Sequence, residues 1–346
     1  MRRHRRSRAL IGALCAVLFL GAFRFSGFND PKSRATAAAA TKWLDTEQQP
    51  DGGFEVAGFP GFETPDAVLA IAENAQTTNK WSTATALAAV SAVKKDGHSA
   101  LAALDTFSGS GLDAGQAAKL VVLDAKPLGL SPTHFNPNGG GGSVNLKALI
   151  LAGAKPDGSY GTFNATLYAA IALRLLTGAV PAKTVANIRA AQEASGGWDF
   201  SGDPKSTNVD IDTTALAIQA LAAANVALND SGLRVGLKFL AAQQRTSGAW
   251  QSFGSDDPNS TSVAILAITA SGFDPTKPCW RDVVDPALTG PYASPIVWIR
   301  SQQQPDGHIA SPNDSFGVNT FASSQSIQAL RREWVPVKPL ARQACP

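Results

Sequence analysis

A glycine-centred turn recurs along nearly the whole chain. Its clearest copies read Gln-Gln-Pro-Asp-Gly-Gly-Phe and Gln-Glu-Ala-Ser-Gly-Gly-Trp, and a shorter, degenerate copy reads Lys-Lys-Asp-Gly-His. The spacing averages roughly fifty residues, a period that is typical of stacked supersecondary units. The chain is therefore built from repeats, whose six turns end at Phe54, His98, Tyr160, Trp198, Trp250 and His308.

Each repeat reads as two helices. In the fourth repeat a helix opens at Pro181 and stops at the glycines after Ser195, which favour a left-handed cap. A second helix starts near Asp210 and is almost entirely apolar or small, so we expect it to be buried on both sides. First helices, such as 41–49 and 233–243, mix polar and apolar residues, and no strand alternation is present. Equivalent inner helices are predicted at 65–75, 114–125, 164–176, 260–270 and 320–330.

Six helix hairpins that cannot bury their own apolar faces must stack, and closing the stack into a ring removes its two uncovered ends. The predicted fold is therefore an all-α closed barrel of six helix hairpins. All inner helices would run in the same direction, so their N-termini would converge on one rim. Unsatisfied N–H groups and aligned dipoles favour polar and acidic partners there. Suitable residues stand at several of these starts, including Asp66, Asn164, Asp210, Asp212 and Asn319.

Residues 1–40 have the layout of an export segment. Five arginines precede an apolar run from 9 to 23, and small residues follow up to position 40. The run is short for a membrane span, which needs about 20 residues, although an uncleaved anchor stays open. We therefore expect a secreted or extracytoplasmic protein that touches membrane only through an uncleaved segment. The predicted divisions are the export segment 1–40, the helical repeats 41–334 and a tail 335–346.

Charge and cysteine content narrow the function classes. The first forty residues carry eight Lys or Arg and one Asp, a net charge of +7, so the remainder has 3 − 7 = −4. A mildly acidic body without basic clusters is not expected to bind nucleic acid. After cleavage Cys279 and Cys345 remain, as one disulfide or as two free thiols. Neither has a Cys or His at metal-ligand spacing, so no metal and no cofactor are expected.

The Gln-x-x-x-Gly-x-Trp pattern at Gln192 to Trp198, repeated at Gln244 to Trp250, resembles the QW repeat of squalene and terpenoid cyclases and of protein prenyltransferase β subunits. The resemblance covers about residues 36–334 and implies an (α/α)6 toroid. The same superfamily includes secreted cobalamin carriers. In the cyclases the Gln caps a helix end and the Trp packs over it, which implies a structural role for these four residues.

The segment from Val209 to Ala215 resembles the Asp-x-Asp-Asp-Thr-Ala motif of class II terpene cyclases. The resemblance implies that Asp212 is a general acid and Asp210 its partner. Thr213 departs from the motif, which has a third Asp at this position. The alternative is that both carboxylates only cap the following helix, because Asp is favoured at helix N-termini.

We therefore hold three hypotheses. The first is an exported protein that binds a small amphipathic organic ligand, isoprenoid-like or corrinoid-like, at the mouth of the toroid. The second is a terpene-cyclase-like enzyme that protonates an isoprenoid through Asp212, and the third is a protein-interaction module. Export and the single barrel favour binding over catalysis. The candidate ligand-binding residues are Asp66, Asn164, Tyr168, Thr213, Thr214, Trp198, Trp250 and Asn319.

Overall fold

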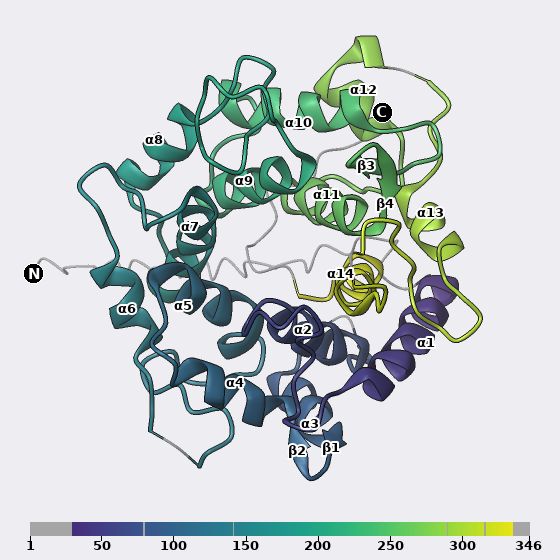
Figure 1. Ribbon diagram of the computed structural model, residues 1–346. Helices are drawn as coiled ribbons and strands as arrows, with labels where there is room; N and C mark the ends of the chain where they lie inside the picture. The colour runs from purple at the N-terminus through teal and green to yellow at the C-terminus, as the bar shows by residue number, and fades with distance from the viewer. Residues whose placement is uncertain (1–29, 79, 141, 289, 315, 335–346) are drawn as a thin grey trace, which may run out of the picture.

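The computed structural model describes residues 30–78, 80–140, 142–288, 290–314 and 316–334. Its helices form two concentric rings (Figure 1). Each inner helix packs against the next, and contacts between the last and the first close the ring. The all-α toroid predicted from the repeats is therefore confirmed. The inner helices are α2 (Thr64–Asn74), α5 (Ala114–Leu120) with a π-helical turn (Val121–Ala125), α7 (Phe163–Thr177), α9 (Ile211–Ala223), α11 (Pro258–Ala270) and α14 (Thr320–Arg331).

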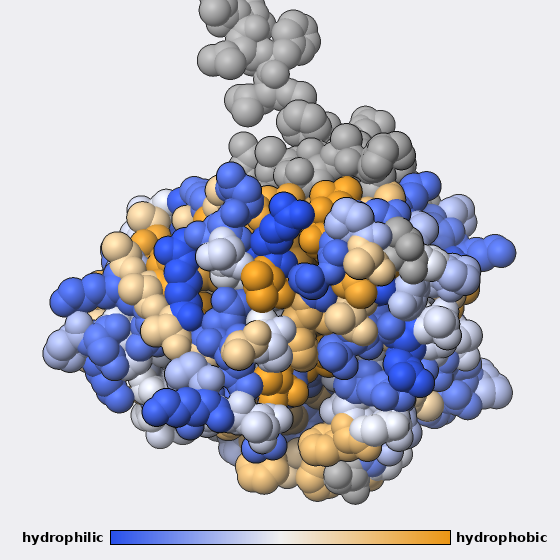
Figure 2. Space-filling model, turned by 90° about the horizontal axis from the view of Figure 1, so that it is seen from above, coloured by the Kyte–Doolittle hydropathy of each residue, from blue (hydrophilic) through white to orange (hydrophobic). Residues whose placement is uncertain are grey.

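The outer ring is less regular, because two of its units are split into shorter helices. The face of the molecule seen in Figure 2 is mostly hydrophilic with apolar residues interspersed. The outer helices are α1 (Pro31–Glu47), α3 (Thr83–Ala92), α4 (Ala100–Ser108), α6 (Leu146–Ala152), α8 (Ala182–Ala190), α10 (Ser231–Gln243), α12 (Cys279–Val284), a 3-10 turn (Pro286–Leu288) and α13 (Pro295–Ser301).

Two short antiparallel ribbons interrupt the helices, although no strands were expected. The first pairs β1 (Lys94–Lys95) with β2 (His98–Ser99), and the second pairs β3 (Trp250–Ser252) with β4 (Ser255–Asp257). The second ribbon immediately precedes α11 and carries Phe253 at its tip, with a positive φ of 47°. Both ribbons are too short to show a period of two in the sequence.

The repeated turn joins an outer helix to an inner helix through side chains. In the fourth repeat, the Gln192 amide donates to the carbonyl oxygens of Gly196 (2.7 Å) and Gly232 (2.8 Å). The backbone N–H of Trp198 donates to the Thr214 hydroxyl at 2.9 Å. The hydroxyl bond recurs where Phe54, Tyr160, Trp250 and Ile309 donate to Thr64, Thr166, Thr261 and Ser323.

The turn glycines let neighbouring repeats touch through their backbones. Gly196 has a φ of +96°, and a Cβ placed there would lie 2.7 Å from the carbonyl oxygen of Val235 in α10. A side chain would therefore clash with the next outer helix as well as strain the backbone. The same close approach to backbone of the following outer unit occurs at Gly52, Gly158, Gly248 and Gly307.

The degenerate copy from Lys94 to His98 does not join an outer to an inner helix. It forms the β1–β2 ribbon between two outer helices, α3 and α4. The connection into α5 is instead the segment 109–113. Its last residue, Asp113, forms a reciprocal capping box with Gln116 in the first turn of α5. Five of the six predicted turns therefore have equivalent positions.

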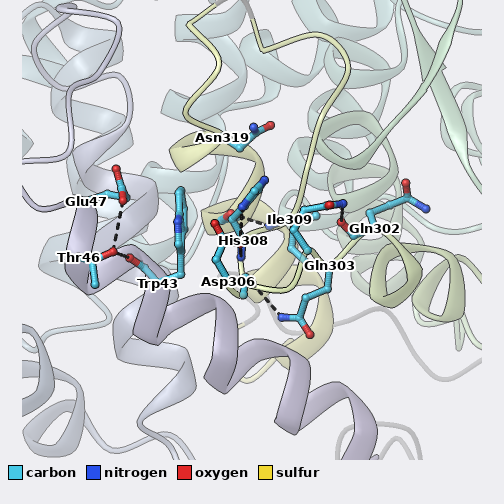
Figure 3. A network of polar contacts seen from close by, with 12 residues as sticks. Trp43, Thr46, Glu47, Gln302, Gln303, Asp306, His308, Ile309 and Asn319 are labelled. Carbon is cyan, nitrogen blue, oxygen red and sulfur yellow. Dashed lines mark hydrogen bonds and ion pairs between the residues drawn. The ribbon is translucent and has the colours of Figure 1, made fainter.

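The ring closes where the last turn meets α1 (Figure 3). The Gln303 amide donates to the carbonyl oxygens of Gly307 and of Thr36 in α1, both at 2.9 Å. The rings of His308 and Trp43 lie 5.3 Å apart. Closure thus uses the same glutamine-to-glycine bond that is found in the turns at Gly52, Gly196 and Gly248.

Helix α1 begins earlier than the sequence indicated. It starts at Pro31, is capped by Asp30, and buries Ala37 and Ala40. Residues 31–40, which we assigned to the export segment, thus form the first part of this outer helix. The apolar run at 9–23 lies outside the described residues, so export stays a prediction. Within the described part of the chain, no helix is long and apolar enough to cross a membrane.

Cys279 is the first residue of α12, whereas Cys345 lies outside the described residues. Their pairing therefore stays a prediction.

Replacing a turn glycine should destabilise the ring more than replacing a glycine at which an added side chain would meet nothing. Gly196→Ala adds left-handed strain of about 1–2 kcal/mol and a backbone clash, so we expect the free energy of unfolding to fall by at least about 2 kcal/mol. Gly178→Ala is the control, because Gly178 has a φ of +81° but a Cβ placed there would meet no atom within 4 Å. Urea unfolding followed by circular dichroism measures both. Equal losses would mean that the contact with α10 contributes nothing.

Candidate functional site

The inner ring encloses a cavity of about 1060 Å³. Its walls come from the first three turns of the inner helices and from the loops that precede them. Within one helix the lining residues repeat at helical spacing, as Asp66, Leu69 and Glu73 do in α2. The cavity therefore has levels, from the rim at the helix N-termini to a deep end.

Most of the wall is apolar. A belt of aliphatic side chains surrounds the middle and lower cavity, and polar groups are concentrated near the rim and at the deep end. Such a cavity suits a ligand with an apolar body and a few polar groups. The belt consists of Leu69, Val122, Leu123, Ile171, Leu216, Val263 and Leu266.

Asp210 and Asp212 have different positions and different roles. Asp210 is the N-cap of α9, and its carboxylate accepts from the Thr213 N–H at 2.6 Å. Asp212 is the second residue of α9, lines the cavity and is open to water within it. The capping hypothesis thus holds for Asp210, while Asp212 is placed to meet a ligand.

The environment of Asp212 favours its protonated form. Enclosure by the toroid wall raises the pKa to about 7, and the negative charges of Asp210 and Asp257 act in the same direction. A hydrogen bond with Ser260 opposes them. At neutral pH a substantial share of Asp212 therefore carries a proton, which a general acid requires.

A buried ion pair lies near the rim. The Lys119 ammonium is 2.9 Å from Asp66 Oδ2 and donates to the carbonyl oxygen of Phe62 at 2.6 Å. It also lies 5.5 Å from the centre of the Phe62 ring. Burial alone would lower the pKa of Lys119, but the charges of Asp66 and Tyr168 and a hydrogen bond to Asp66 raise it. Lys119 is therefore held charged.

The deep end contains an acid that burial keeps neutral. Glu73 is fully buried, and its Oε2 accepts from the Glu333 N–H at 3.2 Å. Burial raises its pKa well above the ordinary value. Gln219 and Gln328 line the same depth, and Trp334 lines the cavity beyond the C-terminus of α14. The deep end thus has polar groups without a compensating cation on the lining.

Exposed phenylalanines surround the mouth on loops from several repeats. Phe253 is 95% exposed, although it lines the cavity. Phe62 is held in place, because its ring stacks on that of Phe321 at 4.8 Å. Together these loop residues make the outer edge of the entrance apolar; they are Phe59, Phe62, Phe200, Phe253 and Phe316.

The structure brings together most of the residues that the sequence singled out. Those that line the cavity are Asp66, Asn164, Tyr168, Asp210, Asp212 and Thr213.

Four predicted residues are not on the cavity wall. Trp198 and Trp250 are fully buried, and their indole N–H groups donate to the outer-helix carbonyls of Ile188 and Leu240. Thr214 is fully buried at the Trp198 turn. Asn319 directly precedes α14 without a side-chain bond to the helix, and its side-chain oxygen accepts from the Ser311 N–H. These four residues fix the repeat rather than contact a ligand in the cavity, so we remove them from the candidate site.

Lys119, Glu73 and Gln325 also line the cavity, and sequence reasoning missed them. A signal was present, because each is a polar residue on an otherwise apolar or small inner-helix face. To use this signal, one would have to know which side of each inner helix faces the ring axis. Among the described residues, no group of three or more His, Cys, Asp or Glu side chains is placed to hold a metal ion.

Comparison with known proteins supports the fold. No protein-family model and no curated protein matches the sequence. The structure is similar to type II terpene cyclase MstE from Scytonema, with a TM-score of 0.59 and 15% identity over 87% of this chain and 98% of that one. An MstE variant in complex with geranylgeranyl dihydroxybenzoate, its substrate, gives a TM-score of 0.59 and 15% identity over 88% and 97% of the two chains.

A protein from Actinoplanes is also similar, with a TM-score of 0.52 and 16% identity over 86% of this chain and 99% of that one. The resemblance to the terpenoid cyclase toroid is thus confirmed at the level of fold. The MstE chain is covered almost completely, so one toroid of this size is enough for a type II terpene cyclase chain. The single barrel therefore no longer favours binding over catalysis.

The unusual titration of Asp212 can be measured directly. In a protein labelled with 13C at aspartate carboxyl carbons, we expect one resonance to titrate near pH 7, because enclosure raises this pKa. That resonance should be missing from the spectrum of Asp212→Asn. A midpoint near pH 4 for the Asp212 resonance would contradict the assignment.

Proposed function

We propose that this protein binds an elongated, amphipathic isoprenoid-like molecule inside the toroid. The observation that carries the proposal is the cavity of about 1060 Å³, which has an aliphatic belt between a polar rim and a polar deep end. Its volume is at the upper end of the usual range for small-molecule sites, about 300–1,000 Å³. The similar fold of MstE, which takes a geranylgeranyl substrate, supports an isoprenoid over a corrinoid.

The apolar mouth is consistent with this ligand. Exposed phenylalanines are costly in water, and an isoprenoid chain that enters between them would cover part of their surface. We also propose, from the N-terminal pattern alone, that the protein acts outside the cytoplasm.

Filling the aliphatic belt should prevent binding. Leu216 lines the cavity on α9, so Leu216→Trp places an indole where the chain of the ligand would lie. We expect the affinity for geranylgeraniol, measured by isothermal titration calorimetry, to fall by at least about tenfold.

Leu151→Trp is the matched control, because Leu151 is 49% exposed on α6, outside the cavity lining. It should bind as the unaltered protein does. If Leu216→Trp is folded and binds normally, the ligand does not occupy this cavity.

A second candidate function is proton-initiated cyclisation by Asp212. It is favoured by one observation, the pKa of about 7 for a carboxyl group that faces the cavity. The protonated carboxyl would donate its proton to a carbon of an alkene, leaving a carbocation and the Asp212 carboxylate. Neighbouring double bonds would close rings onto the cation, and loss of a proton to a base would end an overall isomerisation. Asp210, bound to Thr213 N–H, would hold the start of α9 in place.

Asp212→Asn separates the two functions. An amide cannot protonate an alkene, so turnover of a polyprenyl substrate to a cyclic isomer should fall by at least about a hundredfold. Binding of the same substrate should change by less than about threefold, because the amide keeps the size and polarity of the carboxyl group. Mass spectrometry of the extracted products and calorimetry measure the two effects. If the intact protein forms no cyclic isomer, only the binding function remains.

A further inference from the structure

Acidic side chains outnumber basic ones on the lining of the cavity. Within the described part of the chain, Lys119 is the only basic residue of the lining. The acidic residues of the lining are Asp66, Glu73, Asp113, Asp210 and Asp212.

The single cation is already compensated. Its ammonium pairs with Asp66 Oδ2 at 2.9 Å and donates to the Phe62 carbonyl at 2.6 Å. The pair is nearly buried, since the side chains of Lys119 and Asp66 are 15% and 5% exposed. A Lys ammonium has three donors, and two of them are used here. Lys119 therefore adds little positive potential for an anionic ligand.

The remaining polar lining includes several hydrogen-bond acceptors. Asp212 faces the cavity, and Asp113 and Asp210 accept backbone N–H bonds at the starts of α5 and α9. The side-chain amides of Gln325 and Asn164 can both donate and accept, and Gln325 Oε1 already accepts from Asn259 at 3.2 Å. Such a surface pairs with a group that donates hydrogen bonds. A diphosphate would bring several negative charges into a poorly solvated space that already contains carboxylates.

We propose that the cavity selects an isoprenoid whose head group is uncharged and carries a hydroxyl, and that it excludes the corresponding diphosphate. This inference rests on the proposed function, because it specifies the head group of a ligand in the same cavity. The repulsive element consists of Asp113, Asp210 and the ionised share of Asp212, because Glu73 is neutral and Asp66 is paired with Lys119. The selectivity therefore arises from rejecting one ligand as well as accepting the other.

The first test uses the full, unaltered chain and two probes. Geranylgeraniol and geranylgeranyl diphosphate differ only in the head group, and calorimetry in one buffer gives both affinities. We expect the alcohol to bind at least about tenfold more tightly. A diphosphate that binds as tightly as the alcohol, or more tightly, overturns this inference and leaves the proposed function standing. If neither probe binds, the proposed function fails and the inference fails with it.

The second test changes the balance of charge. Asp66→Asn removes the partner of Lys119, so the ratio of the affinity for the diphosphate to the affinity for the alcohol should rise by about tenfold. Asp96→Asn is the matched control, with the same change of charge on the exposed β1–β2 ribbon. It should alter neither affinity. An equal gain in affinity for the diphosphate in the two variants would show that the cavity charges do not set the selectivity.

A second variant, Lys119→Gln, tests the same charge balance if Asp66→Asn does not fold. Lys119→Gln leaves Asp66 without its cation, and should weaken diphosphate binding further by about fivefold or more. A stronger affinity for the diphosphate in this variant would contradict the inference, as would a preference for the diphosphate in the unaltered protein.

Discussion

The arrangement of the toroid depends on one repeated interaction, the hydrogen bond from a buried backbone N–H after each glycine turn to a hydroxyl on the next inner helix. At Trp198 and Thr214 this bond sets the height of the inner helix relative to the outer one. A glutamine amide holds the turn from the other side, and the glycine touches the backbone of the following outer unit. The hydroxyl bond and the glycine contact recur at five turns and the glutamine bond at four of them, so the turns register the hairpins both internally and with their neighbours.

This register has a direct consequence for the cavity. Because the inner helices begin at similar levels, polar residues from their first turns meet on one tier, although they are far apart in sequence. Asp66 and Asp212 are separated by nearly half of the chain and line the same space. The residues that hold the turns, such as Trp250 and Thr261, lie in the wall and leave the inward face of each helix open to other side chains. Structural and ligand-facing positions are thus separated within each repeat.

The acids of the cavity and its wall work against the stability of the fold. Burial raises the pKa values of Glu73 and Asp124 well above their ordinary range, and enclosure raises that of Asp212 to about 7. Between the unfolded and folded pKa values the folded chain binds more protons than the unfolded one. The contribution of these groups to the free energy of unfolding therefore falls as pH rises through that window. Acids that oppose folding are expected at a site that uses them, since strong pKa perturbation is concentrated at functional sites.

The sequence by itself determined the repeats, the all-α class and the inner helices. The repeat period, the glycine turns and the continuous apolar runs can all be seen in the sequence itself. For example, the predicted helix 114–125 corresponds to α5 and its π-helical turn. The sequence did not reveal that α1 starts at Pro31, because a run of alanines is compatible with a signal-peptide cleavage region and with a helix. Only the tertiary structure decided that Asp210 caps while Asp212 faces the cavity, and that Lys119 is paired with Asp66. The reason is physical: the direction of a side chain depends on the rotation of its helix about its own axis, which packing between distant repeats sets.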